Sequence, residues 1–121
     1  MAKTSGGTVG VVDDDSAVLD SLKFLLEVTG HRVAVYGSAA QFLQNETEQL
    51  SCLILDHQMP QMTGLELVAR MRNDGVRIPV LLISGSLSQA IVTRAAELGI
   101  EKVLEKPLND DDLVNFVSAF C

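Results

Sequence analysis

Four short stretches, each leading to a polar side chain, constrain the fold of this chain more than any other feature of its sequence. They span Thr8–Val12, Cys52–Leu55, Ile78–Ile83 and Lys102–Glu105, and they are followed by Asp13 and Asp14, Asp56, Ser84 and Lys106. Short runs rich in Val, Ile and Leu, separated by helical patterns, are typical of buried strands in a parallel sheet. Ligands bind such sheets at the carboxyl ends of the strands. The sequence therefore predicts that carboxylates, a hydroxyl and an ammonium group meet at one edge of a sheet.

The segments between these stretches carry helical patterns and one more strand. Helices are predicted over Ser16–Thr29, from an N-cap at Ser38 through Leu43, over Gly64–Arg72, over Ser88–Leu98 and from about Asn109 onward. The fifth strand is predicted over Arg32–Tyr36, and Pro79 is expected to open the fourth. In the first helix Val18, Leu22, Leu25, Leu26 and Val28 form the expected apolar stripe, and in the last helix Leu113, Phe116, Val117 and Phe120 do so.

Five successive β-α units predict an α/β fold, a doubly wound five-stranded parallel sheet with five helices on two faces. The strand Arg32–Tyr36 alone ends without candidate site residues, at Tyr36-Gly37. If the polar crevice lies at the point where the strand order reverses, this strand belongs at an edge. The expected strand order is therefore 2-1-3-4-5.

Length and composition narrow the class of protein. We expect residues 1–121 to form a single domain, with residues 1–7 as a flexible N-terminal tail. The net charge of −7 argues against direct nucleic-acid binding by this chain. No signal peptide and no apolar window of about 20 residues is found, so we expect no membrane association. Cys52 and Cys121 are expected to be free thiols, which favours a cytoplasmic location.

The predicted polar cluster has a definite chemistry. Asp13, Asp14 and Asp56 bring three carboxylates to two adjacent strand ends, and such proximity is unfavourable unless a cation neutralises the charge. Oxygen ligands of this kind suit Mg²⁺ or Mn²⁺. Asp56, at the middle of the crevice, is the best candidate for a nucleophile toward a phosphoryl group. Ser84 and Lys106 are then expected to donate to phosphoryl oxygens.

These residues resemble the receiver domain of two-component response regulators. The matching motifs are Val11-Val12-Asp13-Asp14, Leu53-Ile54-Leu55-Asp56, Met59-Pro60-Gln61-Met62-Thr63-Gly64, Ile83-Ser84-Gly85 and Glu105-Lys106-Pro107, and the resemblance covers Val9 to about Phe120. The segments from Val11 to Val18 and from Tyr36 to Ala39 look most like NarL/FixJ-type receivers. The resemblance implies a flavodoxin/CheY-like fold and, for the full-length protein, an output that in this group is usually a DNA-binding helix-turn-helix.

The resemblance also implies a role for each site residue. It makes Asp56 the phosphoacceptor, Ser84 the switch hydroxyl and Lys106 the phosphate-binding lysine. For the metal, it makes Asp14 a direct Mg²⁺ ligand, Asp13 a second acid that often acts through water, and the Gln58 backbone carbonyl a further ligand. The phosphoryl group would come from a sensor histidine kinase or a phosphotransfer protein. Such a domain catalyses only its own phosphorylation and slow autodephosphorylation. Phosphorylation is expected to alter the face formed by Ser88–Leu98, Lys102–Leu104 and the last helix, and to promote a homodimer.

Two positions depart from or add to the family pattern. The family commonly has Tyr or Phe where this chain has Val103, and a branched aliphatic side chain cannot swing inward as a ring does. His57 directly follows Asp56 and is expected to be a surface or packing residue rather than a titrating one.

Two other functions are compatible with parts of the pattern. A receiver-like scaffold would bind partners without phosphorylation, which the complete set of acids, hydroxyl and lysine argues against. A haloacid-dehalogenase-like phosphatase also uses an Asp nucleophile with Mg²⁺, and Asp13-x-Asp15 formally matches its short motif. The chain length leaves no room for a cap domain or substrate pocket of such an enzyme.

Overall fold

Strands and helices alternate along the whole described chain. A computed structural model describes residues 7–45 and 49–121. The elements are β1 (Thr8–Val12), α1 (Ser16–Val28), β2 (Arg32–Tyr36), α2 (Ala39–Leu43), β3 (Leu50–Asp56), α3 (Gly64–Asn73), β4 (Val80–Ser84), α4 (Gln89–Glu97), β5 (Lys102–Glu105) and α5 (Asp110–Phe120). The predicted tail over residues 1–7 lies outside the described residues except for Gly7. Among the described helices, none is long and apolar enough to cross a membrane.

The sheet has the predicted topology. Its order is β2-β1-β3-β4-β5, and every neighbouring pair is parallel. Val12 lies opposite Leu55, and Asp56 lies opposite Ile83, so the carboxyl ends of β1, β3 and β4 are in register. β3 is longer than predicted and includes Asp56, while β4 begins later than predicted, at Val80. This alignment brings the polar residues that end the strands to one edge.

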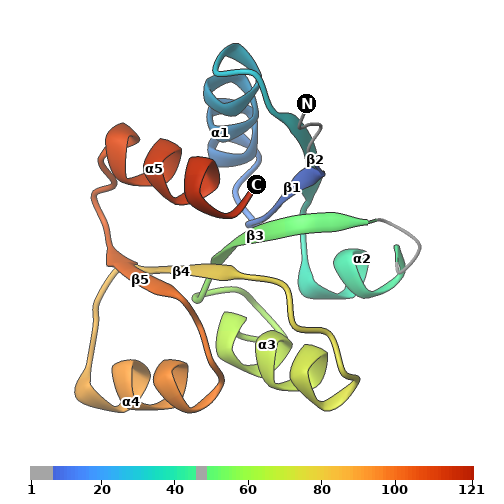
Figure 1. The fold of residues 1–121 in the computed structure, drawn as a ribbon. Helices are drawn as coiled ribbons and strands as arrows, with labels where there is room; N and C mark the ends of the chain where they lie inside the picture. The colour runs from blue at the N-terminus through green and yellow to red at the C-terminus, as the bar shows by residue number, and fades with distance from the viewer. Residues whose placement is uncertain (1–6, 46–48) are drawn as a thin grey trace.

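Helices cover both faces of the sheet, as expected for a doubly wound fold (Figure 1). α1 and α5 pack on one face, over strand residues such as Val11 and Ile54. α2, α3 and α4 lie on the other face, over strand residues such as Leu53 and Leu82. Each of these four strand residues is at most 1% exposed, because side chains on both faces of a parallel strand are covered by helices.

Polar caps fix where the helices begin. Asp15 accepts hydrogen bonds from the first-turn N–H groups of α1, and Ser38 caps α2 as predicted. Thr63 and Glu66 form a reciprocal capping box at the start of α3. Asn109 caps α5, whose first turn carries Asp110–Asp112, where carboxylates favour the positive end of the helix dipole.

Two apolar residues of the predicted stripes, Val28 and Phe120, are exposed. The buried residues of α1 are Leu19, Leu22 and Leu26, and Val28 is 63% exposed because it lies on another side of the helix. Phe120 is 41% exposed, and its ring packs on that of Phe116 with 4.9 Å between centroids. Helical spacing predicted the buried Leu22 and Leu26 of α1, but it missed Leu19 and wrongly included Val28. In α5 it predicted the buried Leu113, Phe116 and Val117.

The prediction of two free thiols is wrong. Cys52 and Cys121 form a disulfide with 6.2 Å between their Cα atoms, within the usual range for such a bond. The pairing is possible because α5 returns across β3 and brings residue 121 to the fully buried Cys52. The cysteines therefore give no support to the inference of a reducing compartment.

Candidate functional site

Three carboxylates converge where β1 and β3 end. Asp13 and Asp14 directly follow β1, and Asp56 is the last residue of β3. One carboxylate oxygen from each lies within 4.8 Å of the others. Asp13 and Asp56 are buried, whereas Asp14 is exposed. The cluster is thus open to ligands on one side and enclosed by protein on the other.

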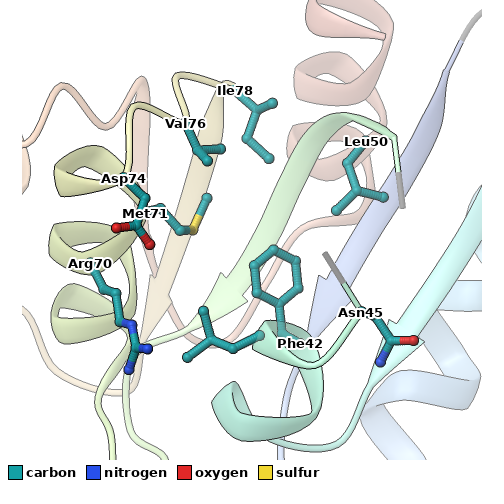
Figure 2. Close-up of a pocket in the computed structure, with 9 residues that line it drawn as sticks. Phe42, Asn45, Leu50, Arg70, Met71, Asp74, Val76 and Ile78 are labelled. Carbon is teal, nitrogen blue, oxygen red and sulfur yellow. The ribbon is translucent and has the colours of Figure 1, made fainter. Parts of the chain in front are cut away.

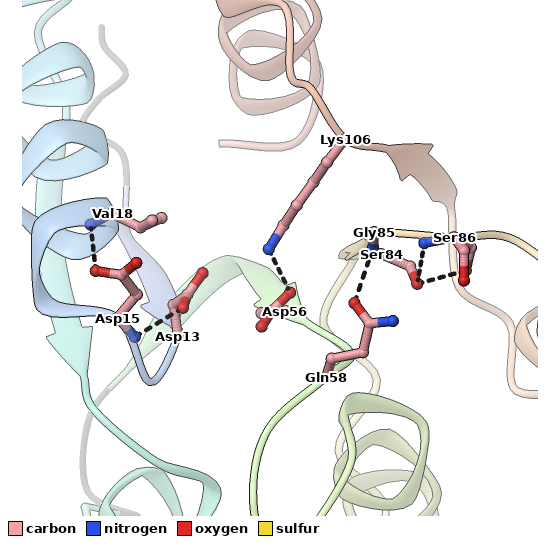
Figure 3. Close-up of polar contacts among 9 residues, drawn as sticks. All are labelled: Asp13, Asp15, Val18, Asp56, Gln58, Ser84, Gly85, Ser86 and Lys106. Carbon is pink, nitrogen blue, oxygen red and sulfur yellow. Dashed lines mark hydrogen bonds and ion pairs between the residues drawn. The ribbon is translucent and has the colours of Figure 1, made fainter.

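Lys106, which directly follows β5, extends its side chain into this cluster (Figure 3). Its backbone N–H donates to the carbonyl of Ser84 at 2.9 Å, which ties the start of the β5–α5 loop to the end of β4. Its Nζ lies 3.2 Å from Asp56 Oδ1. The peptide bond between Lys106 and Pro107 is cis. The structure therefore brings together Asp13, Asp14, Asp56 and Lys106 as the sequence predicted.

The surroundings of Asp56 disfavour its charge. Burial raises the pKa of this carboxyl, and the adjacent Lys106 ammonium, which lowers it, only partly offsets the effect. The charge of Asp14 adds repulsion that also raises the pKa. Asp56 Oδ1 is buried and accepts no well-directed hydrogen bond within the described residues, although Lys106 is near enough for an ion pair.

Asp13 is under similar constraints. Burial raises the pKa of its carboxyl, and the charge of Asp56 raises it further, against a lowering by the hydrogen bond from the Asp15 N–H at 2.9 Å. Two buried carboxyls with raised pKa values, side by side, indicate a site built for a positively charged ligand. The three oxygen ligands and the unsatisfied Asp56 Oδ1 suit a hard divalent cation.

Ser84 belongs to the same edge, but its hydroxyl is turned elsewhere. The residue is fully buried at the end of β4, and its Oγ donates to the Ser86 carbonyl at 2.7 Å. Figure 3 shows this hydroxyl directed to the side away from Asp56. Gln58, the predicted source of a carbonyl ligand, uses its side chain to accept from the Gly85 N–H. No pattern in the sequence predicted that side-chain contact.

The backbone that follows Asp56 is held by close packing. The His57 N–H donates to Ile83 O, and its carbonyl accepts from Gly64 N–H at 2.9 Å. A Cβ at Gly64 would lie 2.7 Å from the Asp56 carbonyl oxygen, so only glycine permits this approach. The half-buried His57 ring accepts from the Leu65 N–H at 3.4 Å, in accord with a packing residue. Val103 is half-buried against the α2–α3–α4 side of the core.

A separate hollow of about 360 Å³ lies between α2, the start of β3 and the end of α3 (Figure 2). Apolar side chains such as Phe42, Leu50 and Met71 line it, with Arg70 and Asp74 beside them. Since Leu50 begins β3 and Asp56 ends it, the hollow is at the opposite edge of the sheet from the carboxylates. It is therefore distinct from the acidic site.

Removing one buried charge should stabilise the cation-free protein. A raised native pKa means that native Asp13 binds its proton more tightly than unfolded Asp13, so ionisation destabilises the native state as the pH rises. Asn at this position retains the oxygen that accepts from Asp15 N–H. We expect Asp13→Asn to be more stable than the parent at neutral pH, and the difference to vanish below the ordinary carboxyl pKa of 3.8.

Urea unfolding at both pH values, in a chelator, measures this difference. Addition of millimolar Mg²⁺ should stabilise the parent more than the variant. The exposed Asp20→Asn is the matched control and should show neither effect. A parent that remains more stable than Asp13→Asn at neutral pH without cation would contradict the charge argument.

Comparison with known proteins gives the family. The family model of the response regulator receiver domain matches residues 9–118 of this chain. The chain belongs to the response regulator receiver domain family. Receiver domains interact with histidine kinases, and the expected resemblance to the NarL/FixJ type is confirmed by relatives named FixJ.

Two curated relatives and two solved structures illustrate the likeness. Response regulator protein TmoT of Ectopseudomonas mendocina is 38% identical over 109 residues, which cover 88% of this chain and 49% of that protein. Transcriptional regulatory protein FixJ of Bradyrhizobium diazoefficiens is 34% identical over 117 residues, covering 96% and 57%. The receiver domain thus spans about half the length of these relatives.

Among solved structures, the crystal structure of FixJ-N has a TM-score of 0.85 at 29% identity, covering 95% of this chain and 93% of that one. A CheY-like receiver domain protein from Methanospirillum hungatei JF-1 has a TM-score of 0.88 at 28% identity, with the same coverage. The CheY-like fold predicted for this receiver domain is confirmed.

Proposed function

We propose that Asp56 accepts a phosphoryl group from a histidine kinase or a phosphotransfer protein. One Asp56 carboxylate oxygen bonds to phosphorus while the bond from phosphorus to the histidine nitrogen breaks, which leaves an acyl phosphate on Asp56. The single observation that carries this proposal is the 3.2 Å approach of Lys106 Nζ to Asp56 within a cluster of three carboxylates. An ammonium group held there would bind a phosphoryl oxygen and stabilise its charge.

We propose that Asp13, Asp14, Asp56 and the Gln58 backbone carbonyl hold Mg²⁺, or alternatively Mn²⁺. When bound, the ion would neutralise the carboxylates and balance phosphoryl charge during transfer. The proximity of the three carboxylates supports this assignment. We expect weak binding, with a Kd on the order of 10⁻⁴–10⁻³ M, as in loosely built oxygen sites.

The proposed consequence of phosphorylation is a change at the face formed by α4, β5 and α5. Ser84 would donate its hydroxyl to the new phosphoryl group and draw the β4–α4 loop with it. Val103 would limit the accompanying change to the backbone, since it has no ring to move. We propose that this face then forms a phosphorylation-dependent homodimer and controls an output in transcription, since the relative FixJ is named a transcriptional regulatory protein. We propose a cytoplasmic location from the family membership alone, because the disulfide removes the argument from free thiols.

Stoichiometry separates this function from that of a phosphatase. With acetyl phosphate and Mg²⁺, the chain should take up at most one phosphoryl group, and the label should then decay as the acyl phosphate hydrolyses. Uptake should be lost in chelator. Continuous turnover of an aryl phosphate would instead support the phosphatase alternative, and binding of a partner without any uptake would support the scaffold.

A further inference from the structure

The loop between β4 and α4 begins with two hydrogen-bond donors that are both engaged. The Gly85 N–H donates to Gln58 Oε1 at 2.9 Å, and the Ser84 hydroxyl donates to the Ser86 carbonyl at 2.7 Å. The first bond joins two loops that are 27 residues apart in sequence. In Figure 3 the Gln58 amide stands between the strand end that carries Asp56 and the start of this loop.

A phosphoryl group on Asp56 would need donors at this place. It brings additional charged oxygens to a carboxylate that, among the described residues, forms an ion pair with Lys106 alone. Asp56 lies opposite Ile83 in the register of β3 and β4, so the next donors along the chain are the hydroxyl of Ser84, which ends β4, and the N–H of Gly85. Backbone N–H groups directed at developing phosphoryl charge stabilise it strongly. The Gln58 amide oxygen therefore accepts from the Gly85 N–H, a donor that a phosphoryl group on Asp56 can use.

The geometry around Gly85 is adapted to this contact. A Cβ at position 85 would lie 3.1 Å from Gln58 Oε1, so any other residue there would require the amide to shift by a few tenths of an ångström. Both Gln58 and Gly85 are exposed, which leaves the Gln58 side chain free to turn into water once it is displaced.

We propose that Gln58 is a positioning residue that holds the β4–α4 loop in its resting arrangement by capping the Gly85 N–H, and that phosphorylation replaces this cap. The inference rests on the proposed function of Asp56. It makes the Gln58 side chain a determinant of how readily the domain switches, separate from the role proposed for its backbone carbonyl.

The test compares Gln58→Met, which keeps the length of the side chain but lacks the amide oxygen, with Gln58→Glu, which keeps an acceptor. The exposed Gln44→Met, at the C-cap of α2, is the control. In the free chain, the NMR signal of the Gly85 amide proton should move upfield in Gln58→Met and stay near the parent position in Gln58→Glu and Gln44→Met. Binding of beryllofluoride with Mg²⁺ should tighten about twofold to tenfold in Gln58→Met, the usual range for one net hydrogen bond.

An unchanged Gly85 amide signal in Gln58→Met would overturn the cap, and so would unchanged or weaker beryllofluoride binding in that variant. Failure of the proposed function looks different, because then Asp56→Asn would bind beryllofluoride as well as the parent does. The Gly85 signal of the free chain tests the cap in either case.

Discussion

Asp56→Asn should lose all phosphoryl uptake from acetyl phosphate or a phosphohistidine kinase. The amide is close to the carboxylate in size but is a poor nucleophile and forms no stable acyl phosphate. Among the described residues, Asp56 is the one buried carboxylate that forms an ion pair, with Lys106. Filter-bound radiolabel measures the uptake, and the exposed Asp20→Asn should retain the parent's stoichiometry.

The variant should remain folded. Removing a buried charge from a cluster of three carboxylates relieves repulsion, so its urea midpoint without cation should equal or exceed that of the parent. Loss of uptake with an intact unfolding transition would locate the defect in the chemistry. Uptake by Asp56→Asn at the parent's stoichiometry would show that another residue is the acceptor.

Reduction of the disulfide between Cys52 and Cys121 should lower the free energy of unfolding substantially. The bond closes a loop between residues 69 positions apart, for which the chain-entropy relation gives about 4 kcal/mol. The effect arises in the unfolded state, which gains freedom when the cross-link is removed. Leu113, Phe116 and Val117 keep α5 packed on the sheet, so the reduced protein should still fold.

Urea unfolding with and without dithiothreitol measures this effect, with free thiols titrated in each sample. Cys121→Ser should resemble the reduced parent and should not respond to dithiothreitol. A parent whose titration shows no free thiol, yet whose urea midpoint is the same with and without reductant, would contradict the expected contribution.

The sequence predicted the sheet and the site because both depend on local patterns. Apolar strands followed by Asp13, Asp56 and Ser84 give the strand ends, and parallel pairing brings those ends to one edge. Ser38 was recognisable as a helix cap for a similar reason, since a cap acts on N–H groups only two or three residues away.

Features that depend on the path of the chain were not predictable in this way. Cys121 can bond to Cys52 because α5 returns across β3. The spacing of two cysteines in a sequence does not predict such a return. Likewise, the Arg72 guanidinium on α3 donates to the carbonyl of Ile78, just before β4, at 3.0 Å and to that of Leu98, just after α4, at 2.8 Å. These contacts join segments far apart in the sequence. The cap of Gly85 by Gln58 joins two loops through one side chain and has no sequence signature.

The position of the phosphoryl group tests the central claim most directly. Borohydride reduces an aspartyl phosphate to homoserine, so the phosphorylated chain can be treated, digested and sequenced by mass spectrometry. The site described here predicts homoserine at position 56, dependent on both acetyl phosphate and Mg²⁺. Homoserine at position 13 or 14 instead, or none at all in a chain that carries label, would contradict the assignment of Asp56 as the acceptor.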